Sequence, residues 1–129
     1  MLKDLTMQYK RFGNRTIYRG DVTGNDFDSG DFTKDNAYHE LDLSSIIPNG
    51  TKFVTLKILV KTDTSGHTLT FRRKGNANEY NTLTGVVPIG LVNFWIIGRC
   101  FVSTDGKIEY KLPNTTYQTL TLLVVDYSI

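Results

Sequence analysis

The sequence has a single cysteine, Cys100, so no disulfide can form within the chain. The apolar run around it, from Gly98 to Val102, favours a small buried side chain over a reactive thiol. A chain without disulfides is expected to be made in a reducing compartment, although a particle assembled there can work outside the cell.

Long apolar runs are also missing. No stretch approaches the roughly 20 apolar residues that a helix needs to cross a bilayer. The start, MLKDLTMQYKRF, has charges where a secretory signal needs a continuous apolar core. We therefore expect neither a signal peptide nor insertion into a membrane.

The sequence has no large excess of charge of either sign. The 15 Lys and Arg and the 13 Asp and Glu leave a formal net charge of +2. A nucleic-acid-binding domain normally has a basic stripe, often with aromatic residues between the lysines, and this pattern is absent. No nucleic-acid partner is expected.

Catalytic motifs are absent as well. His39 and His67 are the only histidines, and neither has a cysteine nearby in the sequence, which argues against a zinc site. No nucleophile elbow is present. Glu40 and Asp42 project from the same strand face, where solvated side chains are far commoner than a glycosidase pair. We expect no enzymatic activity and no cofactor.

One acidic loop is a weak calcium candidate. Asp26, Asp28 and Asp31 lie close together in the sequence and could supply carboxylate oxygens. The loop departs from the EF-hand pattern, because Gly30 occupies its fifth position and Ala37 replaces the bidentate glutamate. A solvated turn is the alternative interpretation.

What the sequence does have is alternation of apolar and polar residues with a period of two. In residues 54–60, four apolar side chains point one way: Val54, Leu56, Ile58 and Val60. The same pattern recurs in residues 67–73, 38–43, 93–102, 107–112 and 118–129, with turn residues between, whereas residues 83–91 are broken by glycine and proline and indicate an edge strand or a crossing loop. No helical period is sustained. The pattern predicts an all-β protein, an antiparallel β-sandwich of about eight strands and of the jelly-roll type.

The chain also divides by composition. Residues 21–36 are rich in aspartate, glycine and asparagine, which is typical of a loop. We therefore expect an N-terminal arm or short hairpin over residues 1–30 and a sandwich domain over residues 31–129.

Two of the expected strands are apolar on both faces. The residues opposite their core rows are Trp95, Ile97 and Phe101 in one strand and Leu123, Val125 and Tyr127 in the other. A sheet in a two-layer sandwich has only one inward face, so the second apolar face needs a cover. Either another copy of the chain covers it, typically in a closed symmetric ring, or residues 1–36 do.

A basic, amide-rich loop follows residues 67–73. Its candidate ligand-binding side chains are Arg72, Arg73, Lys74, Asn76, Asn78 and Tyr80. Guanidinium groups suit planar anions, amides suit sugar hydroxyls, and a tyrosine ring offers a stacking face, so an acidic glycan or a phosphate polymer fits this chemistry. In the alternative interpretation the arginines are solvated or paired with acidic side chains, and the asparagines shape the loop.

Residues 31–129 resemble a compact jelly-roll domain of bacteriophage tail fibres and other virion-associated proteins. The similarity lies in DFTKDNAYHELDLSSIIPNG, FRRKGNANEYN, DGKIEYK and the final alternating strand, in this order. The resemblance implies a non-enzymatic structural or host-adhesion module of a virion, made in the host cytoplasm. It also implies a homotrimer whose partners are other virion proteins and a host-surface glycan.

Two features depart from this resemblance. The first thirty residues have no counterpart in the pattern, and no long fibre shaft is present. A tail-tip, fibre-head or capsid-decorating subunit is therefore expected rather than a whole fibre. The alternative from another functional class is a monomeric carbohydrate-binding module.

Overall fold

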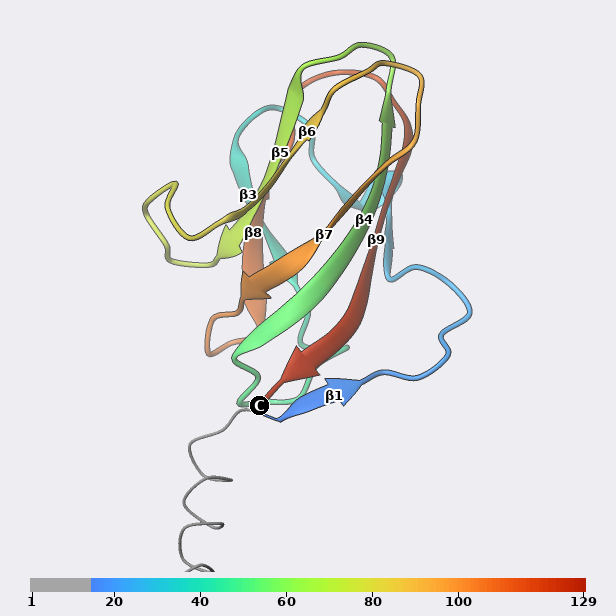
Figure 1. Cartoon of the computed structure of the whole chain (residues 1–129). Helices are drawn as coiled ribbons and strands as arrows, with labels where there is room; N and C mark the ends of the chain where they lie inside the picture. Colours follow the sequence, from blue (N-terminus) through green and yellow to red (C-terminus); the bar gives the residue numbers. More distant parts are fainter. Residues whose placement is uncertain (1–14) are drawn as a thin grey trace, which may run out of the picture.

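The computed structural model describes residues 15–129, which form two antiparallel sheets packed face to face (Figure 1). The first sheet has the order β1-β9-β4-β7, with β2 also paired to β9. Its strands are β1 (Thr16–Tyr18), β2 (Phe27–Asp28), β4 (Phe53–Thr62), β7 (Phe94–Phe101) and β9 (Tyr117–Ser128). A short 3-10 turn, Ser29–Asp31, follows β2.

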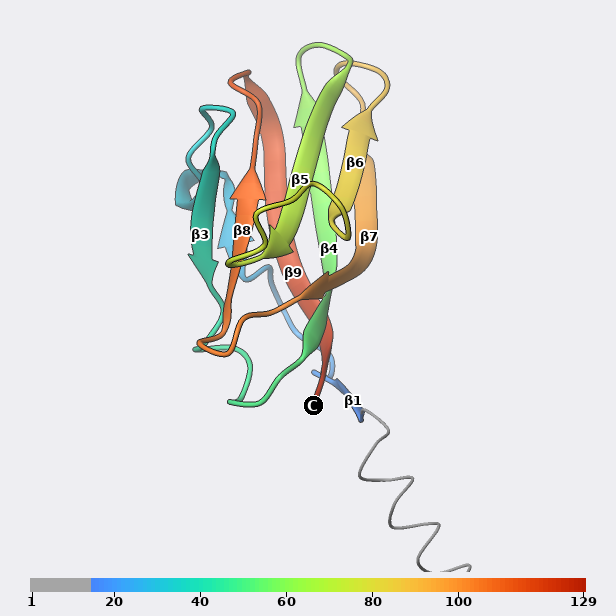
Figure 2. The same ribbon diagram turned by 90° about the vertical axis from the view of Figure 1, so that its left-hand side faces the viewer.

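The second sheet has the order β3-β8-β5-β6 (Figure 2). Its strands are β3 (Tyr38–Asp42), β5 (His67–Arg73), β6 (Leu83–Val87) and β8 (Lys107–Lys111). From β2 to β9, every connection except the one from β5 to β6 crosses between the sheets, and the resulting order is that of an eight-stranded jelly roll. The predicted antiparallel sandwich is confirmed, with β1 as a ninth strand.

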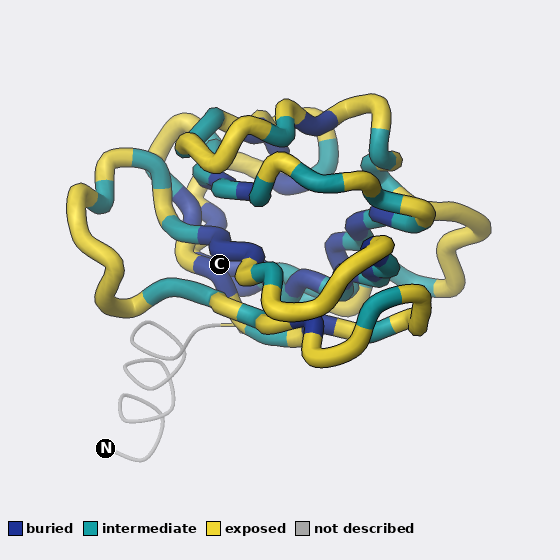
Figure 3. Tube along the Cα trace, turned by 90° about the horizontal axis from the view of Figure 1, so that it is seen from above, coloured by how far each residue is buried: buried dark blue, intermediate teal, exposed yellow. Residues whose placement is uncertain are grey.

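The core lies between the two layers, where Figure 3 shows the buried positions facing one another. The predicted inward row of β4, from Val54 to Val60, is fully buried, and so are Leu69 and Phe71 of β5 in the opposite sheet. Each such side chain contributes on the order of 1.5–3 kcal/mol when it leaves water. The period of two in the sequence therefore orients both sheets correctly.

The pairing of β9 with β4 has two register shifts, and the one near the C-terminal end of β9 reverses the predicted faces. Leu56 lies opposite Val124 and Thr55 opposite Asp126, so Val125 is an extra residue in a β-bulge. Beyond a bulge the faces are exchanged. Tyr127 consequently lies opposite Val54 and packs against the core, and the prediction that it shares the outer face with Leu123 is wrong.

The segment expected to be an N-terminal arm contributes two strands to the first sheet. β1 pairs with the end of β9 and β2 with its middle. Between them, the Arg19 guanidinium donates to Asp26 Oδ2 at 2.6 Å and to the Val124 carbonyl at 2.8 Å, and the Val124 N–H donates to Asp26 Oδ2. The sheet thus begins N-terminal to residue 31; the first 14 residues, with most of the expected hairpin, lie outside the described part.

Two glycines let the edges of the sandwich approach closely. A Cβ added to Gly85 of β6 would lie 2.4 Å from Cδ1 of Ile96, and one added to Gly98 of β7 would lie 2.5 Å from Cδ1 of Leu83. Each glycine therefore receives a side chain from the strand that faces it. Of the two structures expected for residues 83–91, an edge strand or a crossing loop, residues 83–87 form an edge strand, β6. The reciprocal packing of the two glycines joins β6 to the first sheet.

Candidate functional site

The outer face of the first sheet exposes an apolar row, which we define as Trp95, Ile97 and Phe101 of β7. Their exposed fractions are 55%, 60% and 43%, which is high for large apolar side chains of one strand. Two cations of the same sheet flank the row: Lys57 Nζ lies 4.6 Å from the centre of the Trp95 ring, and the Arg99 guanidinium lies 4.1 Å from the Phe53 ring. Residues 15–36 leave the row uncovered.

The β9 part of this face is different. Leu123 and Val125 are half-buried, and they line a shallow hollow with Tyr18, Val22 and neighbouring residues of the N-terminal segment. Of the two covers expected from the sequence, the chain's own N-terminal segment flanks the β9 residues of this face. The apolar row of β7 has no cover in the described part of the chain.

The two cations at the centre of the predicted ligand cluster are neutralised within the chain. Arg72 Nε donates to Glu109 Oε1 at 2.8 Å, and its guanidinium lies 3.4 Å from the centre of the Tyr38 ring. Lys74 Nζ donates to Asp105 Oδ2 at 2.7 Å. This hydrogen bond is the main cause that lowers the pKa of Asp105 to about 2. Neither cation is free for an anionic ligand.

The amides of the same cluster shape their own loop. Asn76 Nδ2 donates to the Tyr80 carbonyl at 3.2 Å, and the Asn78 N–H donates to Asn76 Oδ1 at 3.0 Å. Arg73 lines a shallow hollow together with Lys74 and its partner Asp105, whereas Tyr80, 84% exposed, does not line it. The two asparagines thus stabilise the loop, and ligand binding by the six residues stays a prediction.

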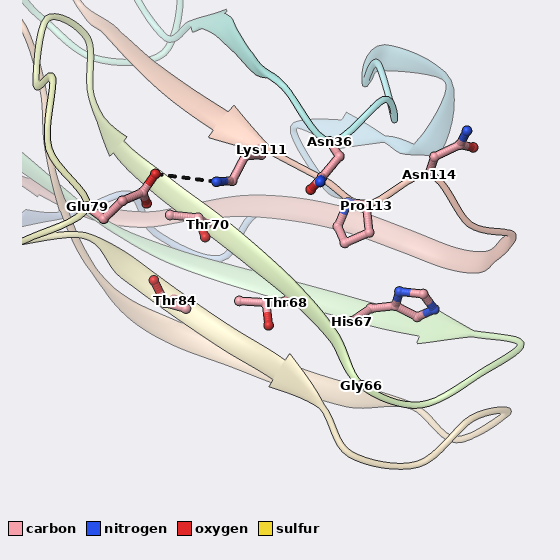
Figure 4. Close-up of a pocket in the computed structure, with 10 residues that line it drawn as sticks. All are labelled: Asn36, Gly66, His67, Thr68, Thr70, Glu79, Thr84, Lys111, Pro113 and Asn114. Carbon is pink, nitrogen blue, oxygen red and sulfur yellow. Dashed lines mark hydrogen bonds and ion pairs between the residues drawn. The ribbon is translucent and has the colours of Figure 1, made fainter.

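The outer face of the second sheet contains a groove of about 730 Å³, which we call the threonine groove. Thr68 and Thr70 of β5 and Thr84 of β6 form its floor (Figure 4). One wall comes from the end of β8 and the loops beside it; the wall residues are Asn36, Lys111, Pro113 and Asn114. Glu79 lies at one end of the groove, and Gly66 and His67 at the other.

A small polar cluster fixes the Glu79 end. The Tyr38 hydroxyl donates to Glu79 Oε2 at 2.7 Å, and Lys111 Nζ lies 3.3 Å from Glu79 Oε1. Burial, together with this hydrogen bond, raises the pKa of Tyr38 to about 12, and the same hydrogen bond lowers the pKa of Glu79. These contacts tie Glu79 of the loop between β5 and β6 to β3 and β8, while the loop itself projects from the second sheet (Figure 1).

In the acidic loop considered for calcium, Asp26 and Asp31 each bind a different group of the chain. Asp26 pairs with Arg19, and Asp31 Oδ2 accepts a hydrogen bond from the Asp28 N–H at 2.8 Å. Among residues 15–129, no group of three or more histidine, cysteine, aspartate or glutamate side chains is placed to hold a metal ion. The three carboxylates therefore do not converge on one point.

Cys100 is buried, as its apolar neighbours predict. Burial raises the pKa of its thiol to about 12, so the thiolate is not populated at neutral pH. The part of the chain that the structure describes also contains no helix long and apolar enough to cross a bilayer.

Comparison with known proteins gave no match: no family model fits the chain, and neither the curated proteins nor the solved structures matched it. The resemblance to the virion-associated jelly roll therefore stays a prediction. The sandwich fold is established independently of it, by the two sheets and their order.

The threonine groove is the feature that sequence reasoning missed. Its residues come from segments far apart in the chain, near positions 36, 67, 80 and 112. One local signal was present, because Thr68 and Thr70 alternate with the core residues Leu69 and Phe71. Two short hydroxyl side chains on an outer face, beside longer side chains of a neighbouring strand, leave a depression there.

Proposed function

We propose that this protein is a non-enzymatic structural and adhesion subunit of a virion that assembles as a homotrimer through the apolar row. The observation on which the proposal rests is the exposure of three large apolar side chains, Trp95, Ile97 and Phe101, on the outer face of one strand. Large aromatic side chains contribute most to the stability of protein interfaces when a partner covers them. The virion context and the trimer come from the resemblance of residues 31–129 to virion jelly rolls.

The position of β7 also supports self-association. It ends the first sheet and pairs only with β4 in the described part of the chain. Natural edge strands are commonly protected by lysine, proline or a covering loop. β7, with the sequence FWIIGRCF, has neither lysine nor proline and has one charged residue, Arg99. Both its edge and its outer face thus favour a second polypeptide.

Sedimentation equilibrium tests the assembly directly. A trimer has three times the subunit mass of 14.6 kDa. We expect Trp95→Ser with Ile97→Ser to dissociate it, because loss of one well-packed aromatic anchor typically costs about 2 kcal/mol, or about 30-fold in affinity. The only tryptophan of the chain is Trp95, so its emission should shift to longer wavelength as the assembly is diluted.

Tyr80→Ser is the matched control, since it removes an exposed aromatic residue from the loop on the other sheet. The control should keep the mass of the unchanged protein. A monomer at about 100 µM, or a double variant at Trp95 and Ile97 that keeps the full mass, contradicts the proposed interface. A dimer that the double variant dissociates supports the interface and contradicts the trimer.

Carbohydrate binding, the alternative expected from the sequence, requires a different surface. The threonine groove offers one, because most of its lining residues have polar side chains and it lies on the sheet opposite the apolar row. Adhesion and assembly are therefore separable by experiment.

A further inference from the structure

The threonine groove has unused hydrogen-bonding capacity. The side-chain hydrogen bonds at the groove are those of Glu79, His67 and Thr84; within residues 15–129 none engages the hydroxyls of Thr68 and Thr70 or the amides of Asn36 and Asn114. Thr70 lines the groove although it is only 4% exposed. Hydroxyls and amides both donate and accept hydrogen bonds. The groove therefore presents four such groups to whatever occupies it.

The charged groups that line the groove are already paired. Lys111 lies 3.3 Å from Glu79, which also accepts the hydrogen bond from Tyr38 (Figure 4). The lowered pKa of Glu79 keeps it ionised at neutral pH, so the ion pair persists there. At the other end, His67 Nε2 lies 2.7 Å from the Thr64 hydroxyl. A phosphate, sulfate or carboxylate thus meets no unpaired lysine in the groove and does meet the Glu79 carboxylate.

An apolar ligand is equally poorly matched. It would cover the hydroxyls of Thr68 and Thr70 without replacing their hydrogen bonds to water, which typically costs 1–3 kcal/mol for each buried group. The threonine methyl groups and the Pro113 ring nevertheless provide small apolar contacts between the polar ones. Alternating C–H and O–H groups are what the ring of a sugar presents. The volume of about 730 Å³ lies within the range of roughly 300–1,000 Å³ that small-ligand sites occupy.

We propose that the threonine groove binds a neutral oligosaccharide. The hydroxyls of Thr68 and Thr70 contact the sugar from below, and the amides of Asn36 and Asn114 contact it from the wall. Glu79, held by Tyr38 and Lys111, closes one end of the groove. This inference names the ligand class for the adhesion part of the proposed function, and it does not depend on self-association, because the groove and the apolar row belong to different sheets.

A glycan array tests the ligand class. The labelled full-length protein is applied to neutral hexose and N-acetylhexosamine oligomers beside sialylated and sulfated ones, and the best neutral glycan is then titrated calorimetrically. Thr68→Val with Thr70→Val removes two hydroxyls while nearly preserving side-chain shape. We expect the affinity to fall about 10- to 100-fold, as lost hydrogen bonds of ordinary strength predict. Asn114→Ala, at an exposed loop position, is a second variant that spares the core.

Thr121→Val is the matched control, since Thr121 belongs to β9 of the other sheet; its affinity should equal that of the unchanged protein. The proposal is overturned if no neutral glycan is retained, if only acidic glycans are retained, or if the double valine variant and Asn114→Ala both bind normally. Sedimentation of the same samples separates the two proposals. A monomeric protein that binds the glycan contradicts only the proposed trimer. A trimer that retains no neutral glycan contradicts only the proposed glycan binding in the threonine groove.

Discussion

The contact between Gly85 and Ile96 yields the sharpest stability prediction. A methyl group added at Gly85 would lie 2.4 Å from Cδ1 and 2.5 Å from Cγ1 of Ile96, whereas carbon atoms in contact normally lie about 3.5–4.0 Å apart. Ile96 is only 8% exposed and is branched at Cβ, so it has few alternative rotamers. In Gly85→Ala, either Ile96 leaves its position or the edges of the two sheets separate.

The size of the effect follows from two opposing terms. Overpacking a core position typically costs about 1–3 kcal/mol, while replacing glycine with alanine lowers the entropy of the unfolded chain and returns about 0.4–1 kcal/mol. We expect Gly85→Ala to lose about 1–2 kcal/mol of unfolding free energy. Gly98→Ala is the matched control. There the single close contact is with the terminal Cδ1 of the half-buried Leu83, which can rotate away, so the change should be within about 0.5 kcal/mol of zero.

Urea denaturation followed by circular dichroism measures both variants, at one fixed protein concentration because assembly would stabilise the folded state. A double-mutant cycle with Ile96→Ala isolates the contact, since the added methyl partly fills the cavity that this truncation leaves. The double variant should be more stable than the sum of the two single effects by about 1 kcal/mol. Equal stability of Gly85→Ala and Gly98→Ala, together with additivity in the cycle, would refute the packing described for this edge.

Two further predictions concern groups with shifted pKa values. Cys100, whose pKa burial raises to about 12, should not react with Ellman's reagent in the folded protein and should react fully in denaturant; rapid labelling of the native state contradicts its burial. The pKa of Asp105 falls from 3.8 to about 2 through its hydrogen bonds to Lys74 and Ser103, so its contribution to stability is complete above about pH 4 and is lost as the pH falls through 2. Asp105→Asn should therefore lower the thermal midpoint at pH 5 and converge with the unchanged protein near pH 2, and an equal difference at both pH values counts against the ion pair.

Local alternation predicted the strands well because one face of each is buried. The sequence predicts the inward rows of β4, β5 and β8, and Ile108, for example, is fully buried as expected. Each of these assignments depends only on side chains two residues apart in the same segment. The jelly-roll order required more, because it depends on which strands pair, and the number and spacing of strands in one domain favoured it.

Features that depend on partners distant in the sequence were harder to predict. The bulge at Val125 exists only in the register between β4 and β9, and it turns Tyr127 inward against a perfect alternating pattern. Arg72 has an acidic partner, Glu109, directly opposite in β8. Until that pairing is known, an arginine beside a polar loop is equally consistent with a ligand site. The threonine groove could not be predicted for the same reason, because its residues are distant in the sequence and come together only in the fold.

The two outer faces of the sandwich differ in their chemistry: one presents mainly polar side chains, many of them paired, and the other presents exposed apolar side chains. Outward positions are free of the core's packing demands, so each face reflects what lies beyond it. On the second sheet, cations such as Arg72 and Lys74 have acidic partners within the chain, and the hydroxyls of Thr68 and Thr70 have no hydrogen-bond partner among the described residues. On the first sheet, three of the four exposed side chains of β7 are apolar, the fourth being Arg99, and apolar side chains gain free energy when another surface covers them. Water competes for sugar hydroxyls but drives apolar side chains together, so the polar face suits reversible recognition and the apolar face suits lasting assembly.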